Sequence, residues 1–247
     1  MPSLQPKLSR VTSAFCDIMS SPPSSFNSAQ SIPLFLPKMS LPTPHYKLSA
    51  IHSNSVYDPA EDTFLLMDAI EKDIQTLRAM NPQIALEIGC GSGVVSTFLN
   101  QALGGKVMSF ATDLNPQALD CTMETARLNN VEIQAVRTDL ETGLDHLKGK
   151  VDILMFNPPY VPTENEPQND LERCWAGGVS GRGALDRLMP RIPELLSPHG
   201  VFYLVALHAN NITELLTHSP LLKGSVTMER RCGIERLYIL KFSRVTT

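Results

Sequence analysis

From residue 56 onward, short apolar runs alternate with segments in which apolar residues recur every three or four positions. The runs predict buried strands, and the recurring spacing predicts amphipathic helices. Strands and helices that alternate through short connections form an α/β fold with a doubly wound, mostly parallel sheet. The predicted strands span 84–88, 107–114, 132–140, 151–156, 201–207, 225–231 and 236–242, and the predicted helices span 61–80, 94–103, 116–128, 142–147, 183–196 and 212–218. We therefore expect a seven-stranded, Rossmann-like sheet whose last two strands form an antiparallel hairpin.

The first 44 residues differ in composition from the rest of the chain. They contain ten serines, eight prolines and a single acidic residue, Asp17. Such a segment cannot bury enough apolar surface to offset the entropy lost on ordering, so we expect a disordered extension at 1–44 and one domain at 45–247. Two alternatives stay open: an organelle transit peptide, for which three basic residues are few, and an extension upstream of a true start at Met39.

Charge, cysteine content and hydropathy narrow the function classes. The chain has 21 basic and 25 acidic side chains and a net charge of −4, which argues against a protein held to nucleic acid by phosphate neutralisation. Its five cysteines are widely spaced and include no CxxC pair. We therefore expect no metal site, no disulfide framework and a reducing compartment, the cytoplasm and also the nucleus. No apolar run approaches the ~20 residues that span a bilayer, so no membrane is expected.

A glycine-rich turn follows the first predicted strand. Residues 87–93 read EIGCGSG, and glycines at alternate positions let a ligand approach the backbone while the chain turns sharply into a helix. The spacing differs from the GxGxxG fingerprint of dinucleotide sites and from the P-loop. Alone, this turn is weak evidence for a ligand site, because a glycine-rich turn can also connect a strand to a helix without binding any ligand.

Three further strands end in polar residues. Asp113 closes the second strand, Asp139 ends the third, and the fourth runs into residues 157–160, NPPY. Ligands of doubly wound sheets bind beyond the carboxyl ends of the strands, so we expect these side chains at the same rim as the glycine turn. Asp113 can accept hydrogen bonds from ribose hydroxyls, and Asp139 can accept from an exocyclic amine. The rim therefore predicts a site for a nucleoside-like ligand that lacks a pyrophosphate.

The NPPY residues are suited to holding an NH2 group. The Asn157 side-chain oxygen and the Pro158 carbonyl oxygen can each accept one N–H, which orients the group and stabilises positive charge developing on its nitrogen. Pro158 and Pro159 restrict the backbone and remove competing donors, and Tyr160 offers a flat face to a planar group. We predict Asn157, Pro158 and Tyr160 as catalytic residues and all four as substrate-binding residues, with no dedicated base. The alternative is a rigid turn without a ligand.

These features resemble the class I S-adenosylmethionine-dependent methyltransferases that modify planar or amide nitrogens. Two flanking segments narrow the resemblance, 57–64 (YDPAEDTF) and 175–178 (WAGG). Together with NPPY they are similar to the eukaryotic HemK-type enzymes, which methylate the glutamine of the GGQ motif in the class I translation release factor. The resemblance covers residues 56–247. It implies S-adenosylmethionine as the cofactor and the release factor as a protein substrate.

The resemblance also implies roles for individual residues. Glu87 and Gly89, helped by Thr63, would hold the amino acid end of the cofactor. Asp113 would bind the ribose and Asp139 the adenine amino group. The complete expected cofactor site is Thr63, Glu87, Gly89, Gly91, Asp113, Leu114, Asp139, Leu140 and Asn157. Members of this family depend on a small zinc-binding activator subunit (Trm112-like), so the resemblance implies a heterodimer.

The NPPY residues alone do not identify the methyl acceptor, because adenine-N6 methyltransferases hold an NH2 group in the same way. The segment between residues 160 and 182 is acidic, with Glu164, Glu166, Asp170 and Glu172. Carboxylates there would repel phosphates but suit a basic protein loop, which favours a protein substrate over nucleic acid. The alternatives that stay open are an adenine-N6 methyltransferase, a protein (histone) lysine methyltransferase and a cofactor-binding subunit without catalysis.

A partner surface is expected at strand 132–140, which should be an outer strand of the sheet. Val131, Ile133 and Ala135 would leave apolar surface beside an unpaired edge, and a partner can cover such an edge by strand addition. The alternative is an edge covered by the chain's own side chains.

Overall fold

The computed structural model describes residues 41–49, 52–165 and 167–245. Most of the extension predicted at 1–44 lies outside these residues, so that prediction is not tested for positions 1–40. The described chain begins against the first long helix, where the backbone N–H of Leu41 donates to Glu71 Oε1 at 3.1 Å.

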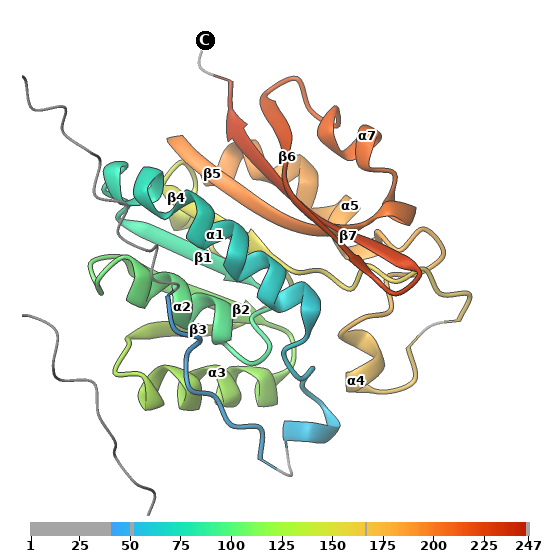
Figure 1. The fold of residues 1–247 in the computed structure, drawn as a ribbon, viewed down its shortest axis with the longest axis horizontal. Helices are drawn as coiled ribbons and strands as arrows, with labels where there is room; N and C mark the ends of the chain where they lie inside the picture. The colour runs from blue at the N-terminus through green and yellow to red at the C-terminus, as the bar shows by residue number, and fades with distance from the viewer. Residues whose placement is uncertain (1–40, 50–51, 166, 246–247) are drawn as a thin grey trace, which may run out of the picture. The chain divides into compact units, whose positions relative to one another are not determined.

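Seven strands form one sheet in the order β3-β2-β1-β4-β5-β7-β6 (Figure 1). The strands are β1 (Ile84–Ile88), β2 (Met108–Asp113), β3 (Ile133–Arg137), β4 (Val151–Phe156), β5 (Leu196–Leu207), β6 (Leu222–Cys232) and β7 (Glu235–Arg244). The first five run parallel, whereas β7 is antiparallel to both β5 and β6. The predicted α/β fold with a C-terminal hairpin is therefore confirmed.

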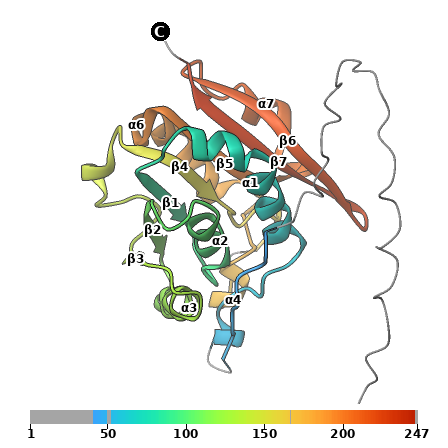
Figure 2. The same cartoon turned by 60° about the vertical axis from the view of Figure 1, so that its left-hand side comes forward.

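Helices cover both faces of the sheet (Figures 1 and 2). One face carries α1 (Glu61–Ala79), α2 (Val94–Ala102) and α3 (Pro116–Leu128), and the other carries α5 (Gly183–Leu188), α6 (Ile192–Leu195) and α7 (Ile212–Leu216). Successive side chains of β5 point to opposite faces of the sheet. Tyr203 therefore packs into the hydrophobic cluster that contains α1, whereas Phe202 and Leu204 pack into the cluster that contains α5. Among the described residues, no helix is long and apolar enough to cross a membrane.

Several elements differ from the prediction. The helix predicted at 183–196 is divided into α5, the 3-10 turn η3 (Met189–Arg191) and α6, because Pro190 and Pro193 lack the N–H that a continuous helix needs. β3 ends at Arg137 rather than at 140, and Leu140 takes a φ of 54° that no strand accommodates. The helix predicted at 142–147 is only the 3-10 turn η2 (Asp145–Leu147). The remaining short elements are α4 (Asp170–Arg173), η1 (His52–Asn54) and η4 (His208–Asn210).

β3 is the outer strand, as predicted, but its apolar side chains lie differently. Ile133 is buried against Ala111 and Ala126, and Val131 packs at the border of the same cluster. The prediction that Ile133 leaves apolar surface is therefore wrong, because α3 covers that face of the strand. Among the described residues β3 pairs with β2 alone, so its other backbone edge is unpaired.

The sheet topology places two loops side by side. After β3 the chain crosses back over β1 to form β4, so the strand order reverses between β1 and β4. Ligands of doubly wound sheets bind at this switch point. The loops that leave β1 and β4 are in contact there, since a Cβ added at Gly89 would lie 3.5 Å from the Phe156 ring and 4.0 Å from the Asn157 carbonyl oxygen.

Candidate active site

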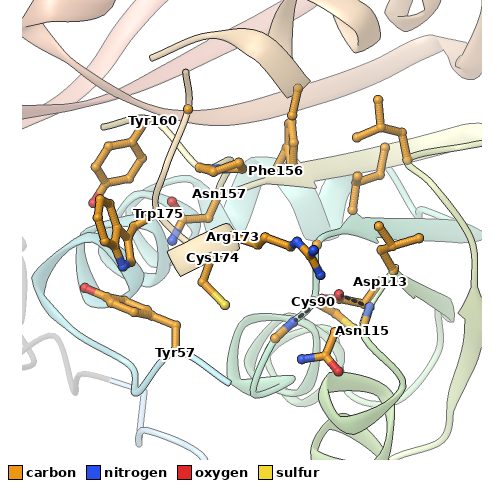
Figure 3. A pocket seen from close by; sticks show the side chains of 18 of the residues that line it. Tyr57, Cys90, Asp113, Asn115, Phe156, Asn157, Tyr160, Arg173, Cys174 and Trp175 are labelled. Carbon is orange, nitrogen blue, oxygen red and sulfur yellow. Dashed lines mark hydrogen bonds between the residues drawn. The ribbon is translucent and has the colours of Figure 1, made fainter. Parts of the chain in front are cut away.

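A cavity of about 1180 Å³ opens at the carboxyl ends of the parallel strands (Figure 3). Every residue of the predicted cofactor site lines it, namely Thr63, Glu87, Gly89, Gly91, Asp113, Leu114, Asp139, Leu140 and Asn157. Pro159 and Tyr160 line it as well. The volume slightly exceeds the ~300–1,000 Å³ of typical ligand pockets, which leaves room for a nucleoside-sized ligand beside a side chain of a second molecule.

Pro158 is the exception among the NPPY residues. It is buried and is not among the residues that line the cavity. The role of the Pro158 carbonyl oxygen as a second acceptor stays a prediction.

The glycine turn allows close packing on two sides. Gly89, Gly91 and Gly93 have φ values of 66°, 51° and 74°, a left-handed region that favours glycine. A Cβ at Gly93 would lie 2.6 Å from Thr122 Cα in α3, so this glycine is required for helix packing. A Cβ at Gly91 would meet nothing within 4 Å, so the turn is open on the side of the cavity.

Glu87 is a buried carboxylate at the floor of the cavity. Its Oε2 accepts a hydrogen bond from the Ser96 backbone N–H at 2.9 Å and another from the Ser96 hydroxyl. Burial raises the pKa of Glu87 to about 8, although both hydrogen bonds act in the opposite direction. Without a ligand the carboxyl group is therefore largely protonated at neutral pH, and a cationic ligand group beside it would favour its ionised form.

Asp113 and Asp139 differ in their surroundings. Asp113 accepts from the Gly91 N–H at 3.1 Å and from the Asn115 N–H at 2.9 Å, and burial raises its pKa. Each of its oxygens keeps a lone pair for a ligand hydroxyl. Asp139 instead forms an ion pair with Arg187 at the surface of the cavity. A ligand amine must therefore share the Asp139 carboxylate with this arginine.

Asp62, at the start of α1, contacts both Asn157 and Tyr160. Asn157 Nδ2 donates to Asp62 Oδ2 at 2.9 Å, and the Tyr160 hydroxyl donates to the same oxygen at 3.0 Å. An ionised carboxylate only accepts hydrogen bonds, so the NH2 end of the Asn157 amide must face Asp62 and its oxygen must point elsewhere. Asn157 Oδ1 and Asp62 Oδ1 are both buried without a partner among the described residues. Two unused acceptors therefore remain at this wall of the cavity.

Aromatic side chains surround this wall. Figure 3 shows Tyr57, Trp175 and Tyr160 gathered around Asn157, with the Cys174 sulfur nearby. Burial and the neighbouring Asp62 raise the pKa of Tyr160 above its ordinary value, and the same causes raise the pKa of Tyr57 to about 12. Both phenols are therefore neutral donors at physiological pH. Tyr57, Asp62 and Thr63 of the segment at 57–64 line the same cavity as the glycine turn.

Asn210 supports the NPPY loop from behind. Its side-chain NH2 donates to the carbonyl oxygens of Tyr160 at 2.9 Å and Gly181 at 3.2 Å, and its oxygen accepts from the Leu207 N–H at 2.7 Å. Neither Asn210 nor the contacts of Asp62 follow from the sequence pattern. Asp62 lies within the flanking segment, but its sequence context also suits the first turn of a helix.

The charge of the lining is more mixed than the acidic segment predicts. Arg137, Arg173 and Arg187 line the cavity together with the carboxylates. Arg173 is paired with Asp170 at 2.8 Å, and Arg187 is paired with Asp139. Within the described residues, no group of three or more histidine, cysteine or acidic side chains is arranged to hold a metal ion.

Comparison with known proteins identifies the family of this chain. Residues 46–223 match the sequence model of the methyltransferase small domain family. The chain is 47% identical over 211 residues to methyltransferase HEMK2 of Mus musculus, covering 83% of this chain and 98% of that protein. It is 39% identical to the eRF1 methyltransferase catalytic subunit mtq2 of Schizosaccharomyces pombe, covering 77% and 90%. Among solved structures, the E. cuniculi Mtq2–Trm112 complex, which methylates the eRF1 termination factor, matches with a TM-score of 0.59 and 28% identity, covering 77% of this chain and 99% of that chain.

Proposed function

This chain belongs to the methyltransferase small domain family and, within it, to the HEMK2 and Mtq2 methyltransferases, and on that premise we propose its reaction. It transfers the methyl group of S-adenosylmethionine to the side-chain amide nitrogen of the glutamine in the GGQ motif of the class I translation release factor. The observation that carries this proposal is the orientation of Asn157, whose unpartnered oxygen lies buried at the cavity while its NH2 group is held by Asp62.

The orientation of Asn157 matches the needs of an amide acceptor. A glutamine amide nitrogen is a weak nucleophile because its lone pair is delocalised into the carbonyl group. An N–H donated to Asn157 Oδ1 holds the nitrogen in place and strengthens as positive charge develops on it during attack. At this wall Asp62 Oδ1 is a further acceptor without a partner among the described residues, in addition to the Pro158 carbonyl oxygen of the sequence prediction. The nitrogen loses its proton only after the new bond forms, so no dedicated base is required.

The donor set of the cavity fits S-adenosylmethionine. We propose that Glu87 and Thr63 hold its amino acid end, Asp113 its ribose and Asp139 its adenine amine, with Leu114 and Leu140 beside the ring. Support comes from the open glycine turn at Gly91 and from the free lone pairs of Asp113. When bound, the cofactor supplies a methyl group on a positively charged sulfur, which is already an activated electrophile.

We further propose a Trm112-like activator subunit and a cytoplasmic location, with the nucleus as a second one. The unpaired edge of β3 supports the first proposal, because an edge strand is a template for another chain. For the second, Cys90, Cys121, Cys174 and Cys232 are free thiols among the described residues, which suits a reducing compartment.

The proposed reaction is tested by offering labelled cofactor to three acceptors in parallel: release factor, histone and duplex DNA. We expect label in the release factor, and we expect replacement of the GGQ glutamine by alanine to remove it. Label that persists after this replacement, or that enters histone or DNA instead, would contradict the proposal. In the enzyme, Asn157→Ala should lower turnover about 10²–10³-fold and leave cofactor binding largely intact.

One observation favours lysine as a second acceptor. The buried Asp62 carboxylate has a free oxygen beside Asn157, and a carboxylate attracts an ammonium group. A lysine would have to lose its proton before attack, because the ammonium nitrogen has no lone pair. Label in histone, together with label in the release factor that disappears on glutamine replacement, would identify this second activity.

A further inference from the structure

The β6–β7 hairpin extends beyond the sheet on the side of the cavity. β7 pairs with β5 only as far as Leu237, whose partner Leu207 is the last residue of β5. Arg231 then pairs with Arg236, and Cys232 pairs with Glu235, within the hairpin alone. Because β5 runs parallel to β4, its C-terminal end lies at the edge where the cavity opens. The hairpin tip therefore projects past this edge, as Figure 2 shows.

The tip presents an apolar side chain that does not contribute to the core. Gly233, with a φ of 62°, and Ile234 form the two-residue turn of the hairpin. Turn positions favour glycine, asparagine and aspartate, so an isoleucine is unusual there. The Ile234 side chain is 100% exposed. Its side chain gains no burial within the described residues, so its apolar surface is free to contact another molecule.

Further exposed apolar side chains lie in the segment between β4 and α5. Trp175 is partly exposed and lines the cavity. Val179 is 85% exposed and follows the lining residue Gly178, just as Ile234 precedes the lining residue Glu235. We call Trp175, Val179 and Ile234 the mouth rim.

We propose that the mouth rim docks the folded domain of the release factor that carries the acceptor glutamine. This proposal rests on the proposed function. An acceptor amide must cross the mouth to reach Asn157, so a protein that presents it on a protruding loop comes to lie against the rim. Each of the three is a lining residue or the sequence neighbour of one, so their exposed apolar surface lies where the acceptor enters, and exposed apolar surface at such a place marks a protein interaction site. The enzyme thus recognises the protein surface as well as the glutamine loop.

The rim is tested with Ile234→Asp and Val179→Asp. The matched control is Leu221→Asp, which also places a charge on an exposed apolar position. Leu221 precedes Leu222, the β6 residue that pairs with Arg244 at the opposite end of the hairpin. Each variant, purified with its activator subunit, is assayed on folded release factor and on a short peptide that contains the GGQ loop. Melting temperature and cofactor dissociation constant verify that each variant is folded.

We expect both rim variants to lower kcat/KM for the folded release factor at least about fivefold, mainly through KM, and to leave the peptide reaction unchanged. The Leu221 variant should match the wild type on both substrates. Equal losses on both substrates, or no loss on the folded factor, would overturn the docking proposal while the proposed function stands. A wild-type enzyme that labels neither substrate would overturn the proposed function, and the rim proposal with it.

Discussion

At the scale of single residues, Asp62 decides which end of the Asn157 amide faces the acceptor. Both Asn157 Nδ2 and the Tyr160 hydroxyl donate to one Asp62 oxygen. If the amide turned by half a rotation, it would present N–H groups to the incoming NH2 group, and two sets of donors would face each other. Asp62 therefore acts as a positioning residue for Asn157, and its own free oxygen adds an acceptor beside it.

Replacing Asp62 with asparagine tests this role. The new side chain can offer an NH2 group of its own, which allows the Asn157 amide to take the inverted orientation. We expect turnover to fall about 10–100-fold and the cofactor dissociation constant to change by no more than about twofold. Asp68→Asn is the control, because Asp68 lies on the same helix but pairs with Arg230 instead. Turnover at the wild-type level in Asp62→Asn would show that Asn157 is held by other means.

Glu87 predicts a pH dependence of stability. Burial raises the pKa of its carboxyl group from 4.5 to about 8. Between these pH values the unfolded chain has released this proton and the folded chain retains it, so the free energy of unfolding falls as pH rises through this window and then levels off. Without cofactor, Glu87→Gln should melt like the wild type near pH 4.5 and at a higher temperature near pH 8. Parallel melting curves across the window would contradict the raised pKa.

Apart from Thr63 in α1, the residues that the sequence predicted correctly for the cavity lining share one property: they stand at strand ends or in the glycine turn. Their positions follow from the topology, because parallel strands bring their carboxyl ends to one edge. Arg187 and Asn210 come instead from α5 and from the turn after β5, and their contacts depend on how those segments pack. No spacing pattern encodes such packing, which is why the sequence did not reveal them.

At the scale of elements, the NPPY loop is held by the segment that follows it. The Val161 N–H donates to the Trp175 carbonyl at 2.9 Å, and the Gly177 N–H donates to the Val161 carbonyl at 2.8 Å. Gly177 packs so closely that an added Cβ would lie 2.5 Å from the Pro159 carbonyl oxygen. Gly177, the first glycine of the WAGG segment, is therefore required by the loop it supports.

Gly177→Ala should push the two segments apart. We expect a loss of about 1–3 kcal/mol in the free energy of unfolding and a larger fall in turnover than in cofactor affinity, because the displaced loop carries Asn157. The control is Gly183→Ala, whose new Cβ would lie 3.3 Å from the Gly177 carbonyl oxygen, a contact that a small shift relieves. Equal effects of the two substitutions, measured by denaturation and by transfer assays, would refute the specific role of Gly177.

Strands were more predictable from sequence than the short helices. The runs at 84–88 and 151–156 coincide with β1 and β4, since fully buried parallel strands are continuously apolar. α3 matches the prediction at both ends, because Pro116 marks its first turn. α4 and the divided helix at 183–195 were less predictable, because tertiary contacts and prolines override a weak apolar period there.

At the scale of the whole molecule, the free edge of β3 defines where a second chain can add. The Thr138 N–H donates to the Asp113 carbonyl of β2 at 3.1 Å. Backbone groups alternate in direction along a strand, so the N–H and C=O groups of Ile133, Ala135 and Arg137 face away from β2. Among the described residues no strand pairs with these groups, so the proposed activator subunit could do so.

Two neighbouring proline substitutions distinguish the role of the outer edge of β3 from the role of the edge that pairs with β2. Ala135→Pro removes an outward N–H and leaves the pairing with β2 intact, so we expect the chain to keep its own melting temperature but to lose co-purification with the activator subunit. Gln134→Pro removes an N–H that faces β2 and should lower the melting temperature as well. Co-purification that survives Ala135→Pro would place the partner on another surface.

The reversal of strand order between β1 and β4 also divides the chain by task. Apart from Thr63 and Asn157, the groups proposed to hold the cofactor lie between residues 87 and 140, whereas NPPY and the mouth rim all follow residue 150. The exception on the acceptor side is Asp62 of α1, which positions Asn157. A single genetic recombination in the connection between β3 and β4 would thus join the cofactor-binding segment to a different acceptor-binding segment, provided that the new segment also fits Asp62. A lineage built this way can change its target by exchanging the C-terminal part of the gene, without reinventing how it obtains its methyl group.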